Sequence, residues 1–193
     1  MIDFSYPNAF NIGLYFLGGG DVYFQWLEGF SAVDKSNPFP INQSLISYLR
    51  RLFTENEFTD PILIAPGVAS LINNLFVLIV AGYTFKKIWE NNEINPDFGF
   101  SSIIVLSLVL NPMCWIHHFV LLVIPYAWLF SEIINNNLKG KGVWITLVSY
   151  FLVILTPLYE GPISLMQNLF MFTRFMGVLI LLKLLLNPKI KGG

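Results

Sequence analysis

Two short groups of residues in this sequence carry side chains that can bind a ligand or take part in a reaction. The first is Asn42–Ser44 (Asn-Gln-Ser), which Arg51 follows, and the second is Trp115–His118 (Trp-Ile-His-His). Amides donate and accept hydrogen bonds, and arginine or histidine can stabilise a phosphate. Histidine also exchanges a proton near neutral pH, and an indole ring offers a flat apolar face. Either group alone is weak evidence for a site, so their value depends on whether the fold brings them together.

Each group also has an interpretation that needs no ligand. Asn42–Ser44 matches the acceptor pattern for N-glycosylation, which often occurs by chance. Backbone groups near a membrane interface can form the hydrogen bonds that the rings of His117 and His118 need. Side chains of adjacent helical residues point about 100° apart, so the two histidines are poorly spaced for one metal ion. Cys114 is the only cysteine, which excludes a disulfide framework or a cysteine-rich metal site. We expect no metal and no cofactor.

The composition indicates an integral membrane protein, or part of one. Of the 193 residues, 55% are hydrophobic and only 12% are charged, and the mean hydropathy is +0.63. Soluble domains carry about a quarter charged residues, and one small core cannot hide this much apolar surface. A soluble enzyme is therefore excluded. The net charge of −1, without basic runs, gives no basis for nucleic-acid binding. The residues after Met1 do not form a cleavable signal peptide pattern.

The hydropathy pattern predicts an all-α, polytopic membrane helix bundle with about five transmembrane helices. A span needs about 20 mostly apolar residues to cross a hydrocarbon core of about 30 Å. Asn111-Pro112 interrupts an apolar stretch that is too long for one helix, because proline removes a backbone donor and disfavours helix in the residue before it. The predicted spans are Ile62–Phe85, Phe98–Leu110, Trp115–Ile134, Val143–Tyr159 and Leu165–Leu186.

Polar residues within these spans need partners. Asn73 and Asn74 lie near the middle of the first span and must face protein or a wet cavity. Arg174, inside the last span, is a candidate functional residue unless it extends outward to the headgroups. The span that ends at Asn111 has only about 13 residues, or roughly 20 Å, so the break should lie in a recess below the headgroups.

Residues 1–60 are expected to form an extracytoplasmic, interfacial segment, and residues 61–193 the transmembrane bundle. Phe10–Leu17 is apolar but too short to span. Asn42 can cap a short amphipathic helix, which we expect to lie flat on the outer membrane surface. Its apolar face would hold Leu45, Leu49, Leu52 and Phe53, and its polar face Gln43, Ser47, Arg50 and Arg51.

The basic residues predict the orientation, because cytoplasmic loops are enriched in lysine and arginine. Seven of the 11 basic residues fall on the side of the C-terminus, and four fall on the other side. The C-terminus is therefore expected in the cytoplasm. Residues 21–60, the break at Asn111–His118 and the loop that holds Glu160 then share the outer face of the cell membrane.

Together the two groups resemble a known family. Asn42–Leu45 (Asn-Gln-Ser-Leu), followed by Arg51-Leu52, resembles the Asn-Gln-Ser-Leu…Arg-Leu element of glycosyltransferase family 87. This is a polyprenyl-phosphate-sugar-dependent, mannosyltransferase-like family with the GT-C fold. Trp115–His118, preceded by Pro112, is similar to its Ser-Pro-Ile-Ser-Trp-x-His-His element. The resemblance covers roughly residues 20–130, and the order of the motifs agrees. The chain departs from the family pattern at Ser47, Asn111, Met113 and Cys114.

The resemblance implies transfer of a sugar, often mannose, from a polyprenyl-phosphate carrier to a hydroxyl acceptor outside the cytoplasm. The acceptor needs a general base, and the departing polyprenyl phosphate needs hydrogen-bond donors and positive charge. Asn42 and Gln43 would then bind sugar hydroxyls or phosphate oxygens. Trp115 would hold the sugar or the prenyl chain. Arg51 and either His117 or His118 would stabilise the phosphate.

The family's catalytic carboxylate is expected in a first outer loop, which this chain does not match. The chain therefore resembles the C-terminal half of a GT-C enzyme, and its partners would be a lipid bilayer, a polyprenyl-phosphate-linked sugar and a missing N-terminal half or partner subunit. Glu160 is a weak candidate for the base. Two alternatives stay open. The chain can be a noncatalytic subunit or degenerate remnant that binds a lipid carrier, or, less favoured, a small transport module.

The Asn-Gln-Ser and Trp-x-His-His elements should converge on one pocket at the outer membrane surface. The break at Asn111-Pro112 leaves polar groups within the membrane that need partners, and the helix after Asn42 can supply them. Of the two histidines we favour His118, because an adjacent pair cannot both face one cavity.

The predicted orientation can be tested by labelling cysteines in intact cells with a membrane-impermeant thiol reagent. Cysteines at positions 42 and 160 should react, because both positions are expected outside. Labelling at residues 139–141 instead would contradict the orientation and, with it, an outer site.

Overall fold

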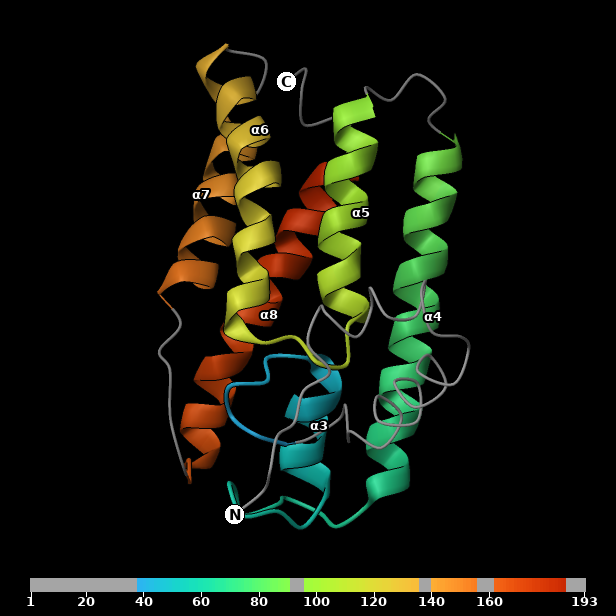
Figure 1. The fold of residues 1–193 in the computed structure, drawn as a ribbon, viewed down its shortest axis with the longest axis vertical. Helices are drawn as coiled ribbons and strands as arrows, with labels where there is room; N and C mark the ends of the chain where they lie inside the picture. Colours follow the sequence, from blue (N-terminus) through green and yellow to red (C-terminus); the bar gives the residue numbers. More distant parts are fainter. Residues whose placement is uncertain (1–37, 91–95, 136–139, 156–161, 187–193) are drawn as a thin grey trace, which may run out of the picture. The chain divides into compact units, whose positions relative to one another are not determined.

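A computed structural model describes residues 38–90, 96–135, 140–155 and 162–186 (Figure 1). In these ranges the regular structure is helical, apart from one isolated antiparallel β-bridge between Asn42 and Trp115. The chain divides into two units, Met1–Lys35 and Ser36–Gly193, and every described element belongs to the second. The predicted all-α membrane helix bundle is therefore confirmed. The predicted division at residue 60, between an interfacial segment and the transmembrane bundle, stays a prediction.

Three of the described helices are long and apolar enough to cross a membrane. They are α4 (Pro66–Glu90), the continuous pair η1 (Ile116–Leu122) and α6 (Val123–Ile134), and α8 (Leu165–Leu185). Two shorter apolar helices, α5 (Pro96–Leu110) and α7 (Lys141–Ile154), complete the described bundle. Each of the five predicted spans thus corresponds to apolar helix. Two of these helices fall short of spanning length within the described residues.

The chain breaks after α5, as Asn111-Pro112 predicts, and then follows a path that the sequence analysis did not anticipate. A turn of backbone after Leu110 is held by Asn111 Oδ1, which accepts a hydrogen bond from Met113 N at 2.9 Å. The next helix starts as the 3₁₀ helix η1 instead of an α-helix. Pro125 acts only at the junction of η1 and α6, because it cannot donate to Leu121 and its ring crowds that carbonyl group. The tighter 3₁₀ winding ends where α6 begins.

Helices α7 and α8 pack along each other more extensively than any other described pair. Gly177 permits this, because a Cβ atom there would lie 3.0 Å from Leu152 Cβ, Ser149 O and Val153 Cγ2. The hydroxyl of Ser149 donates to Gly177 O at 2.8 Å and lies 2.8 Å from Tyr126 Oη. This chain of polar contacts links α6, α7 and α8 inside the bundle, where an unsatisfied hydroxyl would be costly.

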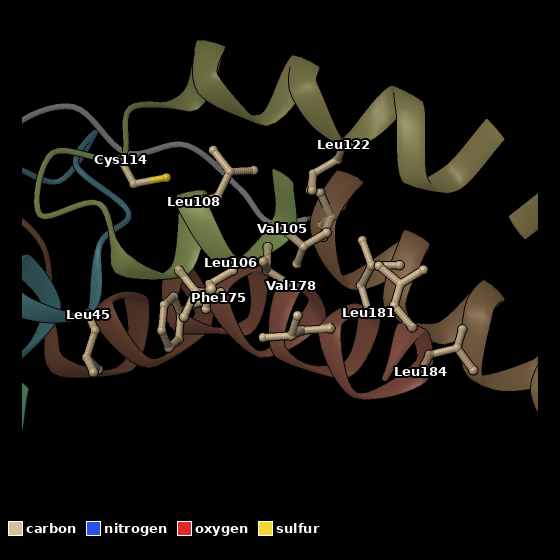
Figure 2. Packing of buried hydrophobic residues seen from close by; sticks show 14 of the residues in the cluster. Leu45, Val105, Leu106, Leu108, Cys114, Leu122, Phe175, Val178, Leu181 and Leu184 are labelled. Carbon is tan, nitrogen blue, oxygen red and sulfur yellow. The ribbon is translucent and has the colours of Figure 1, made fainter. Parts of the chain in front are cut away.

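The apolar core lies between α8 and α5. Val105 and Leu106 of α5 and Phe175, Val178 and Leu181 of α8 belong to one buried cluster (Figure 2). The short helix α3 (Leu45–Phe53) contacts α4 and α8, as α5 also does. Because α5 is short, α3 lies beyond its end, between the same two helices (Figure 1). We call this part of the bundle the α3 end.

The expectation that α3 lies flat on the membrane surface is wrong. Its apolar residues Leu45, Leu49 and Leu52 are buried, but so are Ser47 and Arg51 of the polar face. The N-cap is Ser44, whose side chain accepts from Ser47 N, and not Asn42. The polar face is covered by protein, because α8 and the segment before α3 supply its hydrogen-bond partners.

This burial also changes the labelling experiment. Asn42 is only 3% exposed, so a cysteine at this position would be shielded from the reagent on either side of a membrane. Glu57, exposed on the connection between α3 and α4, is the better reporter of the same end. Glu160 lies outside the described residues.

Replacing Gly177 by alanine should destabilise the bundle by about 1–3 kcal/mol, because the added methyl group overpacks the contact between α7 and α8. Thermal unfolding in detergent, followed by circular dichroism, measures this. Gly99→Ala is the matched control, since a Cβ there meets nothing within 4 Å and alanine favours helix. Equal unfolding temperatures for the two variants would contradict the close packing at Gly177.

Candidate functional site

The side chain of Asn42 joins the two sequence groups at the α3 end. Its Oδ1 atom accepts from Cys114 N at 3.1 Å and from Ser44 N at 3.1 Å, and its Nδ2 atom donates to Pro112 O at 3.1 Å. Ser44 Oγ donates to the same carbonyl at 2.9 Å, and Gln43 N donates to Cys114 O at 2.8 Å. Segments that are 70 residues apart in the sequence are therefore held together mainly by one amide.

The break after α5 explains why an asparagine lies here. Residues 112–114 have no helical partners for their backbone groups, and such groups must be satisfied when they are buried. A short side chain with one acceptor and one donor atom can meet an N–H and a C=O at once. The β-bridge between Asn42 and Trp115 shows that the Asn-Gln-Ser and Trp-x-His-His elements lie together, as predicted, while a shared pocket at the outer membrane surface stays a prediction.

Arg51 has a different role from the one expected for it. It is 1% exposed, and its Nε atom donates to Asn168 Oδ1 at 2.7 Å. Its Nη1 atom lies 2.9 Å from Ser47 Oγ and 3.2 Å from three carbonyl oxygens of the segment Pro38–Asn42. Burial lowers the pKa of Arg51 to about 10, so it keeps its charge at neutral pH. Because these contacts use its donor atoms on protein groups, Arg51 positions Asn42 and does not have the expected role of a direct phosphate ligand.

Gln43 is likewise turned into the protein. Its side chain is 4% exposed, and Nε2 donates to Pro40 O at 2.7 Å. Together with the contacts of Asn42 and Arg51, this shows that the Asn-Gln-Ser…Arg element forms the support of the site. The surface that can meet a ligand comes from the other element.

Asn168 of α8 was not identified from the sequence. It is completely buried, and it accepts the short hydrogen bond from Arg51. Its Nδ2 atom has no hydrogen-bond partner in the described part of the chain. The sequence did contain an indication of its role. Asn168 lies in the same predicted span as Arg174, and polar residues inside a membrane usually have a structural or functional role.

Trp115, His117 and His118 form an accessible cluster of three rings. Trp115 is 39% exposed, His117 is exposed and His118 is half-buried. The ring centroids of the two histidines are 4.4 Å apart, and those of Trp115 and His117 are 6.0 Å apart. The rings of the two adjacent histidines meet edge to face at the start of η1. Whether only one of them faces a cavity stays a prediction.

The contacts of His118 assign its proton. Its Nδ1 atom accepts from Trp115 N at 3.1 Å, while its own backbone N–H donates to Trp115 O at 2.9 Å. An acceptor Nδ1 in a neutral imidazole leaves the hydrogen on Nε2. The ring is therefore fixed by the first turn of η1 and by a hydrogen bond with the backbone of Met113. The choice of His118 over His117 stays a prediction.

Arg174 adds a buried positive charge behind this cluster. It is 5% exposed, its Nε atom donates to Val153 O at 3.0 Å, and its guanidinium carbon lies 5.4 Å from the centre of the Phe119 ring. It therefore does not extend outward to the headgroups. Burial raises the pKa of Cys114 to about 12, and the nearby charge of Arg174 opposes this rise. At neutral pH Cys114 is thus a buried thiol instead of a nucleophile or metal ligand.

The described acidic residues do not complete a catalytic pair with these histidines. No group of three or more histidine, cysteine or acidic residues in the described ranges could hold a metal ion. The connection before α8 does reach the α3 end, because Ile163 N donates to Phe58 O at 2.7 Å. Glu160 lies outside the described residues, so its position relative to the histidines stays a prediction.

Asn42→Ala should destabilise the protein by about 2–4 kcal/mol, because it leaves the backbone groups of Pro112 and Cys114 without partners. Thermal unfolding in detergent measures the loss. Asn135→Ala is the control, since its side chain is exposed and makes one long contact of 3.4 Å to Ser131. A loss at Asn42 as small as that at Asn135 would show that the amide does not hold the break.

Comparison of this chain with protein-family models, with curated proteins and with solved structures gives no match. The function of the site therefore has to follow from its own geometry and from the family resemblance of its two motifs. That geometry is a supported break between membrane helices, with an accessible indole, two imidazoles and a buried cation beside it.

Proposed function

We propose that this chain is the carrier-binding part of a membrane glycosyltransferase. It would help to transfer a sugar, mannose by the resemblance, from a polyprenyl-phosphate donor to a hydroxyl acceptor at the outer face of the cell membrane. The observation that supports this most is the bonding of Asn42 to Pro112 and Cys114. It joins the two elements that resemble family 87 at one end of the bundle.

The proposed ligand has a charged head and a long apolar chain, and both find matching groups. The phosphate would accept a hydrogen bond from His118 Nε2, taking the place of the backbone of Met113, with His117 beside it and the charge of Arg174 behind the break. Such donors are most effective on a departing phosphate, where negative charge develops as the bond to the sugar breaks. Trp115 would stack against the sugar. The prenyl chain would lie in the bilayer beside Val120 and Leu121, which are exposed on η1.

The general base for the acceptor hydroxyl is the part of this mechanism that the described residues do not supply. Glu160 is the candidate within this sequence, and the resemblance points otherwise to a carboxylate on a missing N-terminal half or partner subunit. A noncatalytic carrier-binding subunit is therefore the second candidate function. It is favoured by the lack of any described hydrogen bond between a carboxylate and either histidine.

Binding tests the proposal directly. The full chain in lipid nanodiscs should bind a polyprenyl-phosphate-mannose, and it should bind the same polyprenol without phosphate much more weakly. His118→Asn should reduce affinity for the phosphate ligand by roughly tenfold to a hundredfold, because it removes a donor to a charged acceptor. Asparagine can still accept from Trp115 N, so the turn is retained. His117→Asn is the comparison, with a smaller expected loss. Equal binding with and without the phosphate would contradict the proposal.

Turnover separates the two candidate functions. We expect no sugar transfer by the isolated 193-residue protein, because no catalytic carboxylate is assigned within it. Release of free polyprenyl phosphate together with a glycosylated acceptor would contradict that expectation. Glu160 would then be the leading base, and Glu160→Gln should abolish transfer while leaving binding of the donor intact.

A further inference from the structure

Two exposed lysines, Lys141 of α7 and Lys183 of α8, lie near the end of the bundle opposite the α3 end (Figure 1). Neither belongs to an ion pair within the described residues. The ion pairs found there join Lys86 and Lys87 of α4 to Glu90, at 3.6 Å and 3.4 Å. The ammonium groups on α7 and α8 are therefore available to an anion from outside the described chain.

Helices α7 and α8 run antiparallel, and their contact at Gly177 fixes the register. A Cβ atom there would lie 3.0 Å from Ser149 O and from Val153 Cγ2. Lys183 comes six residues after Gly177, which places it level with the first two turns of α7. Because α7 begins at Lys141, the two lysines are within about 9 Å of each other along the helix axes.

Both lysines lie on the side of this helix pair that is turned away from η1 and α6. On α7, Tyr150 packs against two aromatic rings of α6. On α8, the guanidinium carbon of Arg174 lies 5.4 Å from the centre of the Phe119 ring of η1. Lys141 and Lys183 are each nine residues from these positions, and nine residues of about 100° each end about 180° around a helix. Since η1 and α6 form one continuous helix, the lysines share the opposite side.

The surface next to the lysines, toward the middle of the bundle, is apolar. Val148 is 49% exposed and Met176 is 41% exposed. They are two residues from Tyr150 and Arg174, respectively, so they lie about 160° around from η1 and α6, on the side of the lysines. Trp144 is 69% exposed at the level of the lysines, and tryptophan is enriched in the headgroup region of membranes. Charge at the membrane surface and apolar side chains beneath it match the two parts of a phospholipid.

We propose that this side of α7 and α8 binds an anionic phospholipid. Its phosphate lies between Lys141 and Lys183, and an acyl chain lies along Val148 and Met176. Charge complementarity selects the occupant, because two lysines without acidic partners attract a headgroup with a net negative charge more than a zwitterionic one. Basic sites between transmembrane helices hold anionic headgroups in this way.

This lipid site does not depend on the proposed sugar transfer. It lies on the other side of the helix pair from η1, at whose start Trp115–His118 form the candidate carrier site. Loss of carrier binding would leave the phospholipid site unaffected. Loss of the phospholipid site would equally leave the break after α5 as described.

Native mass spectrometry of the full chain in detergent, with phosphatidylglycerol or phosphatidylcholine added, tests the proposal. The unaltered chain should bind one phosphatidylglycerol more tightly than phosphatidylcholine. Lys141→Gln and Lys183→Gln should each lower the affinity for phosphatidylglycerol about fivefold, and the double variant about 25-fold. Lys86→Gln is the matched control, because it removes the same charge at the same end of the bundle from a lysine that Glu90 already pairs. Its affinity should be nearly unchanged.

A second measurement locates the lipid. Bimane attached to Val148→Cys should be quenched more by phosphatidylglycerol with brominated acyl chains than by brominated phosphatidylcholine at the same mole fraction. Leu78→Cys is the control, because Leu78 is 70% exposed on α4 and should be quenched equally by both lipids. Cys114 is only 2% exposed, so it adds little label.

The variant with both Lys141→Arg and Lys183→Arg keeps the charge and should keep the preference, which separates loss of binding from damage to the fold. Three results would each overturn the proposal. They are equal affinity for the two phospholipids, an equal loss in the Lys86→Gln and Lys141→Gln variants, and equal quenching at position 148 by both brominated lipids.

Discussion

Where a membrane helix is broken, the free N–H and C=O groups of its backbone need hydrogen-bond partners other than water. The α3 end of this protein is arranged around that constraint. After α5 the chain turns through Pro112–Trp115, where N–H and C=O groups lose their helical partners inside the bundle. Asn42 satisfies two of them with one side chain, and Ser44 and Gln43 add further bonds. The burial of α3 follows from this, because the segment before it has to reach the break.

The same constraint separates the residues that support the site from those that can meet a ligand. Arg51, Asn42 and Gln43 are buried and use their polar atoms on protein groups. Trp115 pairs with Asn42 in the β-bridge, the two histidines follow it in η1, and all three side chains remain at least partly accessible. The Asn-Gln-Ser…Arg element can thus support a site without touching its ligand.

The apolar helices could be predicted from the sequence, whereas the role of the polar residues could not. The break at Asn111-Pro112 ended α5 at Leu110, because proline excludes the helix that would continue through it. The alternation in α3 identified an amphipathic helix, but a polar face looks the same in sequence whether water or Asn168 covers it. The 3₁₀ start of the next helix was not predicted, because the apolar pattern of Ile116–Leu122 does not distinguish it from an α-helix. The approach of the two elements was expected from the short span and from the resemblance together, whereas the pairing of Asn42 with Trp115 was not.

The most direct test of this account uses the native cysteine at the break. Gln43 and Cys114 are opposite each other in the antiparallel contact, with Gln43 N donating to Cys114 O at 2.8 Å, and opposite residues in such pairs have Cα atoms about 5.5 Å apart. Oxidation of the Gln43→Cys variant in membranes should therefore link positions 43 and 114, a bond that peptide mass spectrometry identifies. Gln43→Cys combined with Cys114→Ser is the control. A linked peptide that depends on Cys114 is the predicted result. Persistence of both thiols under conditions that oxidise a denatured sample would contradict the junction on which the site depends.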